Sequence, residues 1–96
     1  MRMMLQTHIE AIKGTAVLQS GSFQQAVEAF VDKFKPEAIY FLPDDGMRSC
    51  VFVFDMQGSE QLPEASEPFF ALGFEVDIRP CMTPADLQAG LAASGL

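Results

Sequence analysis

The stretch "RSCVFVFDM", Arg48–Met56, decides how this chain folds. Between its ends it reads Cys-Val-Phe-Val-Phe, with no polar residues in alternation. A strand with one solvated face should alternate apolar and polar residues, because successive side chains point to opposite faces of a sheet. The stretch therefore predicts a strand whose two faces are both buried, so other parts of the protein or a partner must pack against each face.

The residues before this strand predict its hairpin partner. The run "EAIYFLP" (37–43) has strand composition, and Asp45-Gly46 suits the positive φ angles of a two-residue turn. In the resulting register Tyr40 pairs with Val51. One face of the hairpin then carries Ala38, Tyr40, Leu42, Val51, Val53 and Asp55. The other face carries Ile39, Phe41, Cys50, Phe52 and Phe54, so apolar groups dominate both.

A strand and a helix precede the hairpin. Residues 2–8 predict a first strand. In "SGSFQQAVEAFVDKF" (20–34) apolar residues recur at the i, i+3, i+4, i+7 spacing of a helix with one buried face. Ser22 and Gln25 have the spacing of a capping box at its start. Residues 9–20 have a weaker helical pattern, which predicts a helical segment or an irregular turn.

A second helix, a strand and a short tail helix follow the hairpin. The stretch "GSEQLPEASEPFFALG" (58–73) predicts a helix with Ser59 as its cap. The stretch "FEVDIRP" (74–80) alternates cleanly, so we expect a strand with one polar face. Thr83 has the position of an N-cap for the tail helix.

The order β-α-β-β-α-β predicts a ferredoxin-like α+β fold in a single domain, residues 1–96. We expect a four-stranded antiparallel sheet with both main helices on one face, and an extra C-terminal helix. The second face of the sheet is then open, although the hairpin is apolar there too. Large exposed apolar patches usually mark an interface, so we expect a homodimer packed through the open sheet face. Alternatively, the tail helix or residues 9–20 fold over that face.

Composition and charge limit the partners. The chain has 6 Lys and Arg against 13 Asp and Glu, a net charge of −7, and its basic residues are scattered. We therefore expect no nucleic acid and no anionic membrane as partners. No apolar run has the length of a membrane span, and the first residues lack the apolar core of a signal peptide. A cytoplasmic protein with two free thiols, Cys50 and Cys81, is the expectation.

No catalytic signature stands out, but five polar side chains are candidates for binding a ligand. His8 is the only histidine and ends the first strand, which in this topology neighbours the last strand. We therefore expect Asp77 and Arg79 to approach His8 and Gln6. A histidine beside a carboxylate can transfer protons near neutral pH. Tyr40 is the only tyrosine, and its hydroxyl can orient a ligand in an apolar pocket.

Each candidate also has an ordinary structural interpretation. His8 is then a strand-end residue with local hydrogen bonds, and Tyr40 is an interface aromatic. Arg48 and Arg79 either bind a carboxylate ligand bidentately or pair with acidic neighbours. Cys50 lies among Phe residues, an environment that raises a thiol pKa and makes a poor nucleophile. One histidine and two separated cysteines form no zinc pattern, so we expect neither a metal nor a cofactor.

The element order, the length and the apolar hairpin resemble the dimeric α+β barrel superfamily of ferredoxin-like proteins. The stretches "KPEAIYF", "FVFDM", "EPFF" and "MTPADLQAGL" are similar to small uncharacterised bacterial proteins, some of which are labelled pantothenate synthetase. That enzyme is much larger and binds ATP through His-rich and Gly-rich motifs. This chain has one histidine and no Gly-rich phosphate loop, so the resemblance implies a fold and no catalytic residue.

Two functions are compatible with these patterns. The first is a small homodimeric binding or structural module with a small-molecule pocket at or near the sheet. The second, implied by the resemblance, is a cofactor-independent enzyme of the monooxygenase or isomerase type that acts on a small, partly apolar organic molecule. His8, Tyr40, Asp77 and Arg79 supply its polar groups. We favour the first, because no polar group of residues has the spacing that catalysis requires.

Overall fold

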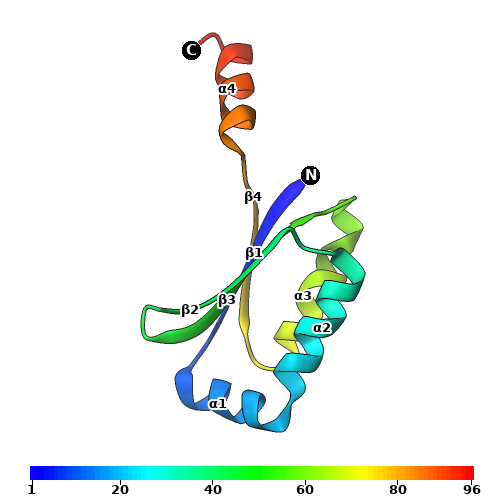
Figure 1. Cartoon of the computed structure of the whole chain (residues 1–96), viewed down its shortest axis with the longest axis vertical. Coiled ribbons are helices and arrows are strands. Elements are labelled where there is room, and N and C mark those ends of the chain that lie inside the picture. The colour runs from blue at the N-terminus through cyan, green and yellow to red at the C-terminus, as the bar shows by residue number, and fades with distance from the viewer.

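The computed structural model describes all of residues 1–96, and its elements follow the predicted order (Figure 1). The strands are β1 (Arg2–Ile9), β2 (Ala38–Asp44), β3 (Met47–Asp55) and β4 (Glu75–Pro80). The helices are α1 (Ala11–Ser20), α2 (Ser22–Phe34), the short 3-10 helix η1 (Ser59–Gln61), α3 (Leu62–Phe70) and α4 (Pro84–Ala93). The strands form one antiparallel sheet in the order β2-β3-β1-β4. The predicted ferredoxin-like α+β fold is confirmed.

The hairpin has the predicted register. Tyr40 pairs with Val51, and the two-residue turn holds Asp45 at a φ of 53° and Gly46 at 75°. β4 alternates as expected, with Val76 and Ile78 packed against the core. These features are local in sequence, which is why turn residues and alternation predict them well.

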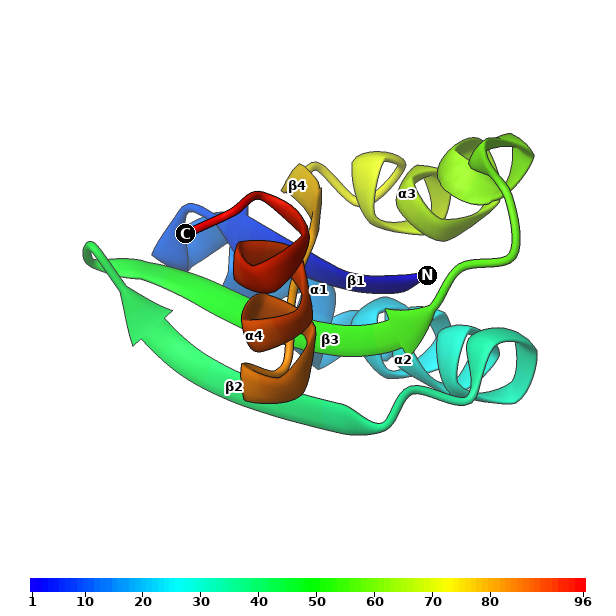
Figure 2. The same cartoon turned by 90° about the horizontal axis from the view of Figure 1, so that it is seen from above.

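The core lies between the sheet and the helices α2 and α3, which both lie to the right of the sheet in Figure 1 and are seen from above in Figure 2. Phe52 of β3 is fully buried at its centre. The ring of Phe30 from α2 lies 4.4 Å from the ring of Phe52, and the ring of Phe69 from α3 lies 5.5 Å from it, centroid to centroid. The face of the hairpin that carries Phe52 is therefore the one that meets the helices.

No segment of the chain folds over the other face of the sheet. In Figure 1 the sheet is seen nearly on edge, α2 and α3 lie to its right, and α1 lies across its lower end. α4 continues upward from β4 and leaves the open face bare. Val51 and Val53 are half-buried there, and Tyr40 is 66% exposed. The alternative in which the tail helix or residues 9–20 fold over this face is therefore wrong.

Two predicted helix caps are wrong. α2 already begins at Ser22, after Gly21 in a left-handed conformation with a φ of 81°, and no side chain caps it. Ser59 likewise makes no capping hydrogen bond. The open choice for residues 9–20 is decided in favour of a regular helix, because the carboxylate of Glu10 accepts hydrogen bonds from the first backbone N–H groups of α1.

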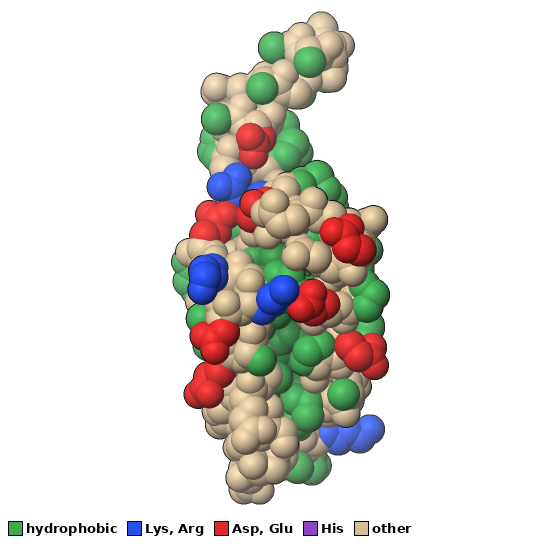
Figure 3. Space-filling model, turned by 90° about the vertical axis from the view of Figure 1, so that its right-hand side faces the viewer, with side chains coloured by type: hydrophobic (Ala, Val, Ile, Leu, Met, Phe, Trp, Pro, Cys, Tyr) green, Lys and Arg blue, Asp and Glu red, His purple; other side chains and the backbone are tan.

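α4 starts as predicted but is exposed along its whole length. The hydroxyl of Thr83 accepts a hydrogen bond from the backbone N–H of Asp86 at 3.1 Å, and the Asp86 carboxylate accepts one from the N–H of Thr83 at 3.0 Å. Figure 3 shows hydrophobic side chains on the part of the molecule that projects from the rest, and in α4 the exposed leucines are Leu87 and Leu91. None of the helices combines the length and apolarity needed to cross a lipid bilayer.

Replacing Phe52 by Ala should remove the centre of the core. We expect the free energy of unfolding to fall by about 3–5 kcal/mol, because the truncation loses apolar burial and leaves a cavity between the two helices. Urea denaturation at a fixed protein concentration measures it. The matched control is Phe70→Ala, since Phe70 is 48% exposed, and there we expect a change within about 1 kcal/mol. Equal losses in the two variants would contradict this description of the core.

Candidate functional site

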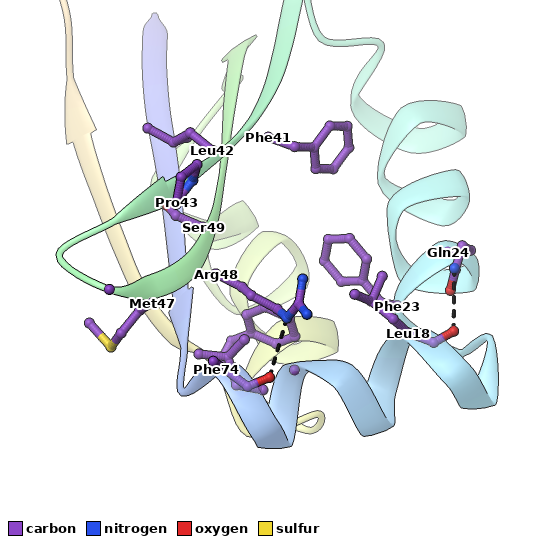
Figure 4. Close-up of a pocket in the computed structure, with 14 residues that line it drawn as sticks. Leu18, Phe23, Gln24, Phe41, Leu42, Pro43, Met47, Arg48, Ser49 and Phe74 are labelled. Carbon is purple, nitrogen blue, oxygen red and sulfur yellow. Dashed lines mark hydrogen bonds between the residues drawn. The ribbon is translucent and has the colours of Figure 1, made fainter.

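A pocket of 730 Å³ opens on the helix side of the sheet, between the hairpin, α1 and the start of α2 (Figure 4). Its volume lies within the range of about 300–1,000 Å³ typical of small-molecule sites. Eight of its fourteen lining residues are hydrophobic. The lining consists of Ile9, Ala11, Gly14, Leu18, Phe23, Gln24, Phe41, Leu42, Pro43, Gly46, Met47, Arg48, Ser49 and Phe74.

Aromatic rings from α2, from β2 and from the residue just before β4 form much of the apolar wall. Phe23 of α2 stacks on Phe74, with the ring centroids 5.3 Å apart, and meets Phe41 of β2 edge to face at 6.1 Å. Phe41 is largely exposed, so this side of the pocket opens to solvent. Rings arranged in this way offer flat, apolar contact area to a ligand.

Arg48 is the only charged residue in the lining. It lies on the helix side of β3, opposite Ile9 in the β1–β3 ladder. Its Nε donates a hydrogen bond to the backbone oxygen of Ala11 at 3.2 Å, and its Nη2 donates one to the hydroxyl of Thr15 at 3.0 Å. No carboxylate forms an ion pair with it. Of the two interpretations of Arg48, pairing with an acidic neighbour is therefore wrong.

On the open face of the sheet, Gln6 and His8 belong to a small hydrogen-bonded cluster. His8 Nε2 lies 2.7 Å from an oxygen of Asp44. The amide of Gln6 donates to the same oxygen at 3.1 Å and to the hydroxyl of Ser49 at 3.2 Å. The His8 side chain is only 14% exposed. A histidine–carboxylate pair is thus present, and its carboxylate belongs to the hairpin turn.

The last strand does not provide that carboxylate. In the β1–β4 ladder Asp77 lies opposite Gln6 and Arg79 lies opposite Met4, yet neither side chain forms a hydrogen bond with His8 or Gln6. β4 is paired with β1, as expected from the topology. The contact itself goes to Asp44, because the side chain of Asp44 reaches across β3, whose Ser49 is paired with His8.

None of the five candidate residues lines the pocket. Gln6, His8, Tyr40, Asp77 and Arg79 all lie on the open face, and the sheet separates them from Arg48 and the aromatic wall. Sequence reasoning did not select Asp44, since a residue at a hairpin turn is normally solvated. The order of the strands is the signal that points to it, because β3 places the end of β2 near the end of β1.

Cys50 is not available for chemistry. Its thiol is fully buried on the core face of β3, and burial raises its pKa to about 11, although a hydrogen bond with the Thr7 hydroxyl lowers it in part. The sulfur and the hydroxyl oxygen are 3.0 Å apart. No group of three His, Cys, Asp or Glu side chains lies close enough together to hold a metal ion.

Comparisons with known proteins give matches among solved structures but none to a family model or a curated sequence. Among solved structures, the chain is similar to a proposed antibiotic biosynthesis monooxygenase of Deinococcus radiodurans, with a TM-score of 0.48 and 11% identity, over 86% of this chain and 94% of that one.

The two cysteines should differ sharply in reactivity. At pH 8 we expect the half-buried Cys81 to react rapidly with a disulfide reagent, and Cys50 to react only after denaturation, because its thiolate is disfavoured and shielded. Counting released chromophore over time measures both phases. The variant Cys81→Ser should lose the fast phase, and Cys50→Ser should keep it. Two fast thiols in the native protein would refute the burial of Cys50.

Proposed function

We propose that this protein is a homodimeric binding module that holds a small, mainly apolar molecule in the pocket between the hairpin, α1 and α2. The observation that supports it most is the pocket lining. Eight hydrophobic residues, among them three Phe rings, surround a space of 730 Å³ that opens to solvent beside Phe41. Concave, mostly apolar sites with a few placed polar groups are the usual form of small-molecule sites.

A second copy of the chain is the proposed cover of the open sheet face, in the manner of the dimeric α+β barrels that the sequence resembles. Tyr40 on the edge strand β2 and Val51 and Val53 on its neighbour β3 make this side of the face apolar, and no segment of the chain itself covers it. α4 also projects with its leucines exposed. Two-fold packing of identical faces is the commonest way in which a chain buries such a surface.

A cofactor-independent enzyme, of monooxygenase or isomerase type, is the second candidate. The 2.7 Å contact between His8 and Asp44 favours it, because a histidine held by a carboxylate can accept a proton from a substrate. In the proposed dimer this pair would lie between the two sheets. We rank the enzyme second, since neither His8 nor Tyr40, Asp77 or Arg79 lines the pocket.

The dimer is tested by measuring molar mass by light scattering across a dilution series. We expect about twice the chain mass of 10.5 kDa. Tyr40→Asp should shift the mass toward that of the monomer, because it places a charge within the proposed interface. Phe70→Asp is the matched control, since it adds the same charge at an exposed Phe of α3 and should leave the mass unchanged. A wild-type monomer at every concentration excludes the homodimer.

Occupancy of the pocket is tested with a neutral aromatic probe. Titration with 2-phenylethanol, followed by amide NMR shifts, should give saturable changes in α1, at the start of α2 and around the hairpin turn. Leu18→Trp should abolish them, because the larger ring fills the lining position of Leu18. Leu62→Trp makes the same change outside the pocket lining and should leave the titration intact. Shifts confined to the open sheet face would argue instead for a site there.

A further inference from the structure

The charge in the pocket indicates the class of ligand. We propose that the pocket selects a small organic monoanion, an apolar body with a single carboxylate that Arg48 binds through two parallel hydrogen bonds. This proposal rests on the proposed small-molecule pocket and names the class of molecule that fills it.

One edge of the Arg48 guanidinium is already used. A guanidinium has five N–H donors in a rigid planar arrangement. Nε donates to the backbone oxygen of Ala11, and Nη2 donates to Thr15, one turn further along α1. The Thr15 hydroxyl also donates to the same oxygen of Ala11 at 3.0 Å. These contacts hold the side-on edge of the guanidinium against α1 and fix its plane.

The other edge of the guanidinium is free. Its donors are Nη1 and the second N–H of Nη2, and no protein group accepts a hydrogen bond from them. This pair of parallel N–H groups matches the two oxygens of a carboxylate. In Figure 4 the guanidinium lies between β3 and α1, and Phe41 and Phe23 line the same space. A carboxylate on Arg48 therefore leaves the ligand's apolar body among the rings.

The pocket lining is free of acidic side chains, although the protein is acidic. The chain has 13 acidic side chains and 6 basic ones, and Arg48 is the only charged residue of the lining. Arg48 contacts only neutral oxygens, and the pocket lining contains neither Asp nor Glu. A lone positive charge beside an apolar cavity favours a ligand with one negative charge.

Gly14 makes room for this arrangement. A Cβ atom at position 14 would lie 2.5 Å from Cδ of Arg48 and 2.9 Å from Cγ2 of Ile9, so any larger residue would displace the Arg48 side chain. Glycine in a helix interior is otherwise unfavourable compared with alanine. Gly14 is therefore a positioning residue, which allows the stem of Arg48 to lie flat on α1.

The test compares 4-phenylbutyrate with 4-phenylbutanamide, which have nearly the same shape and differ in charge. Calorimetric titration of the full chain at pH 7 should show the acid binding at least about tenfold more tightly than the amide, the effect of hydrogen bonds to a charged group. Arg48→Met should reduce the affinity for the acid to that for the amide. Arg79→Met removes an arginine on the opposite face and should change neither affinity.

Gly14→Ala provides a second variant that favours helix α1. It should lower the ratio of acid to amide affinity, because Arg48 is displaced, while the amide still binds. A purely structural role of Gly14 would weaken both ligands together or neither.

The outcomes separate this inference from the function on which it rests. Equal affinities of acid and amide in the wild-type protein would overturn the carboxylate preference and leave the pocket as proposed. A preference for the acid that survives in Arg48→Met would overturn the role of Arg48. Failure of both compounds to bind would overturn the proposed pocket function itself, and the inference with it.

Discussion

The burial of Phe52 between α2 and α3 is the contact on which the rest of the structure depends. Because side chains alternate along β3, fixing Phe52 toward the helices also fixes the direction of its neighbours. Val51 and Val53 then face away from the helices, and Arg48 faces toward them. At Arg48 the element packed against this face of β3 is α1, and no longer the aromatic core. The alternation that builds the core therefore also places a positive charge at the edge of the pocket.

The sheet divides the polar chemistry of the molecule into two places. One face has a single cation among aromatic rings, an arrangement that can hold an anion with an apolar body. The other has a half-buried histidine hydrogen-bonded to a carboxylate in a mainly apolar surface. A binding module needs only the pocket beside Arg48. An enzyme that used His8 would need its substrate between the sheets of two copies. The separation is the physical reason for ranking binding above catalysis.

The sequence predicted what is local and left open what depends on three strands at once. Asp45-Gly46 and the alternation around it predict the hairpin register, and the element order predicts the fold. The sequence did not decide which hairpin face meets the helices, because both are apolar. The contact of His8 with Asp44 could be predicted only with the order of the strands in hand. The hydrogen bonds of Arg48 to α1 could be predicted only from the path of that helix, which passes close to Arg48 at Gly14. That path depends on Glu10, whose capping role a weak apolar pattern does not reveal.

α4 has ten residues, and every one of them is exposed in the isolated chain. Helices of this length are marginal in water on their own, and most of their stability comes from packing of an apolar surface. Thr83 and Asp86 lower the cost of starting the helix, but they do not bury Leu87 or Leu91. If the proposed second copy covers these leucines, winding of the C-terminal segment and association of the two chains become linked equilibria. The helical content of the last residues then rises with protein concentration.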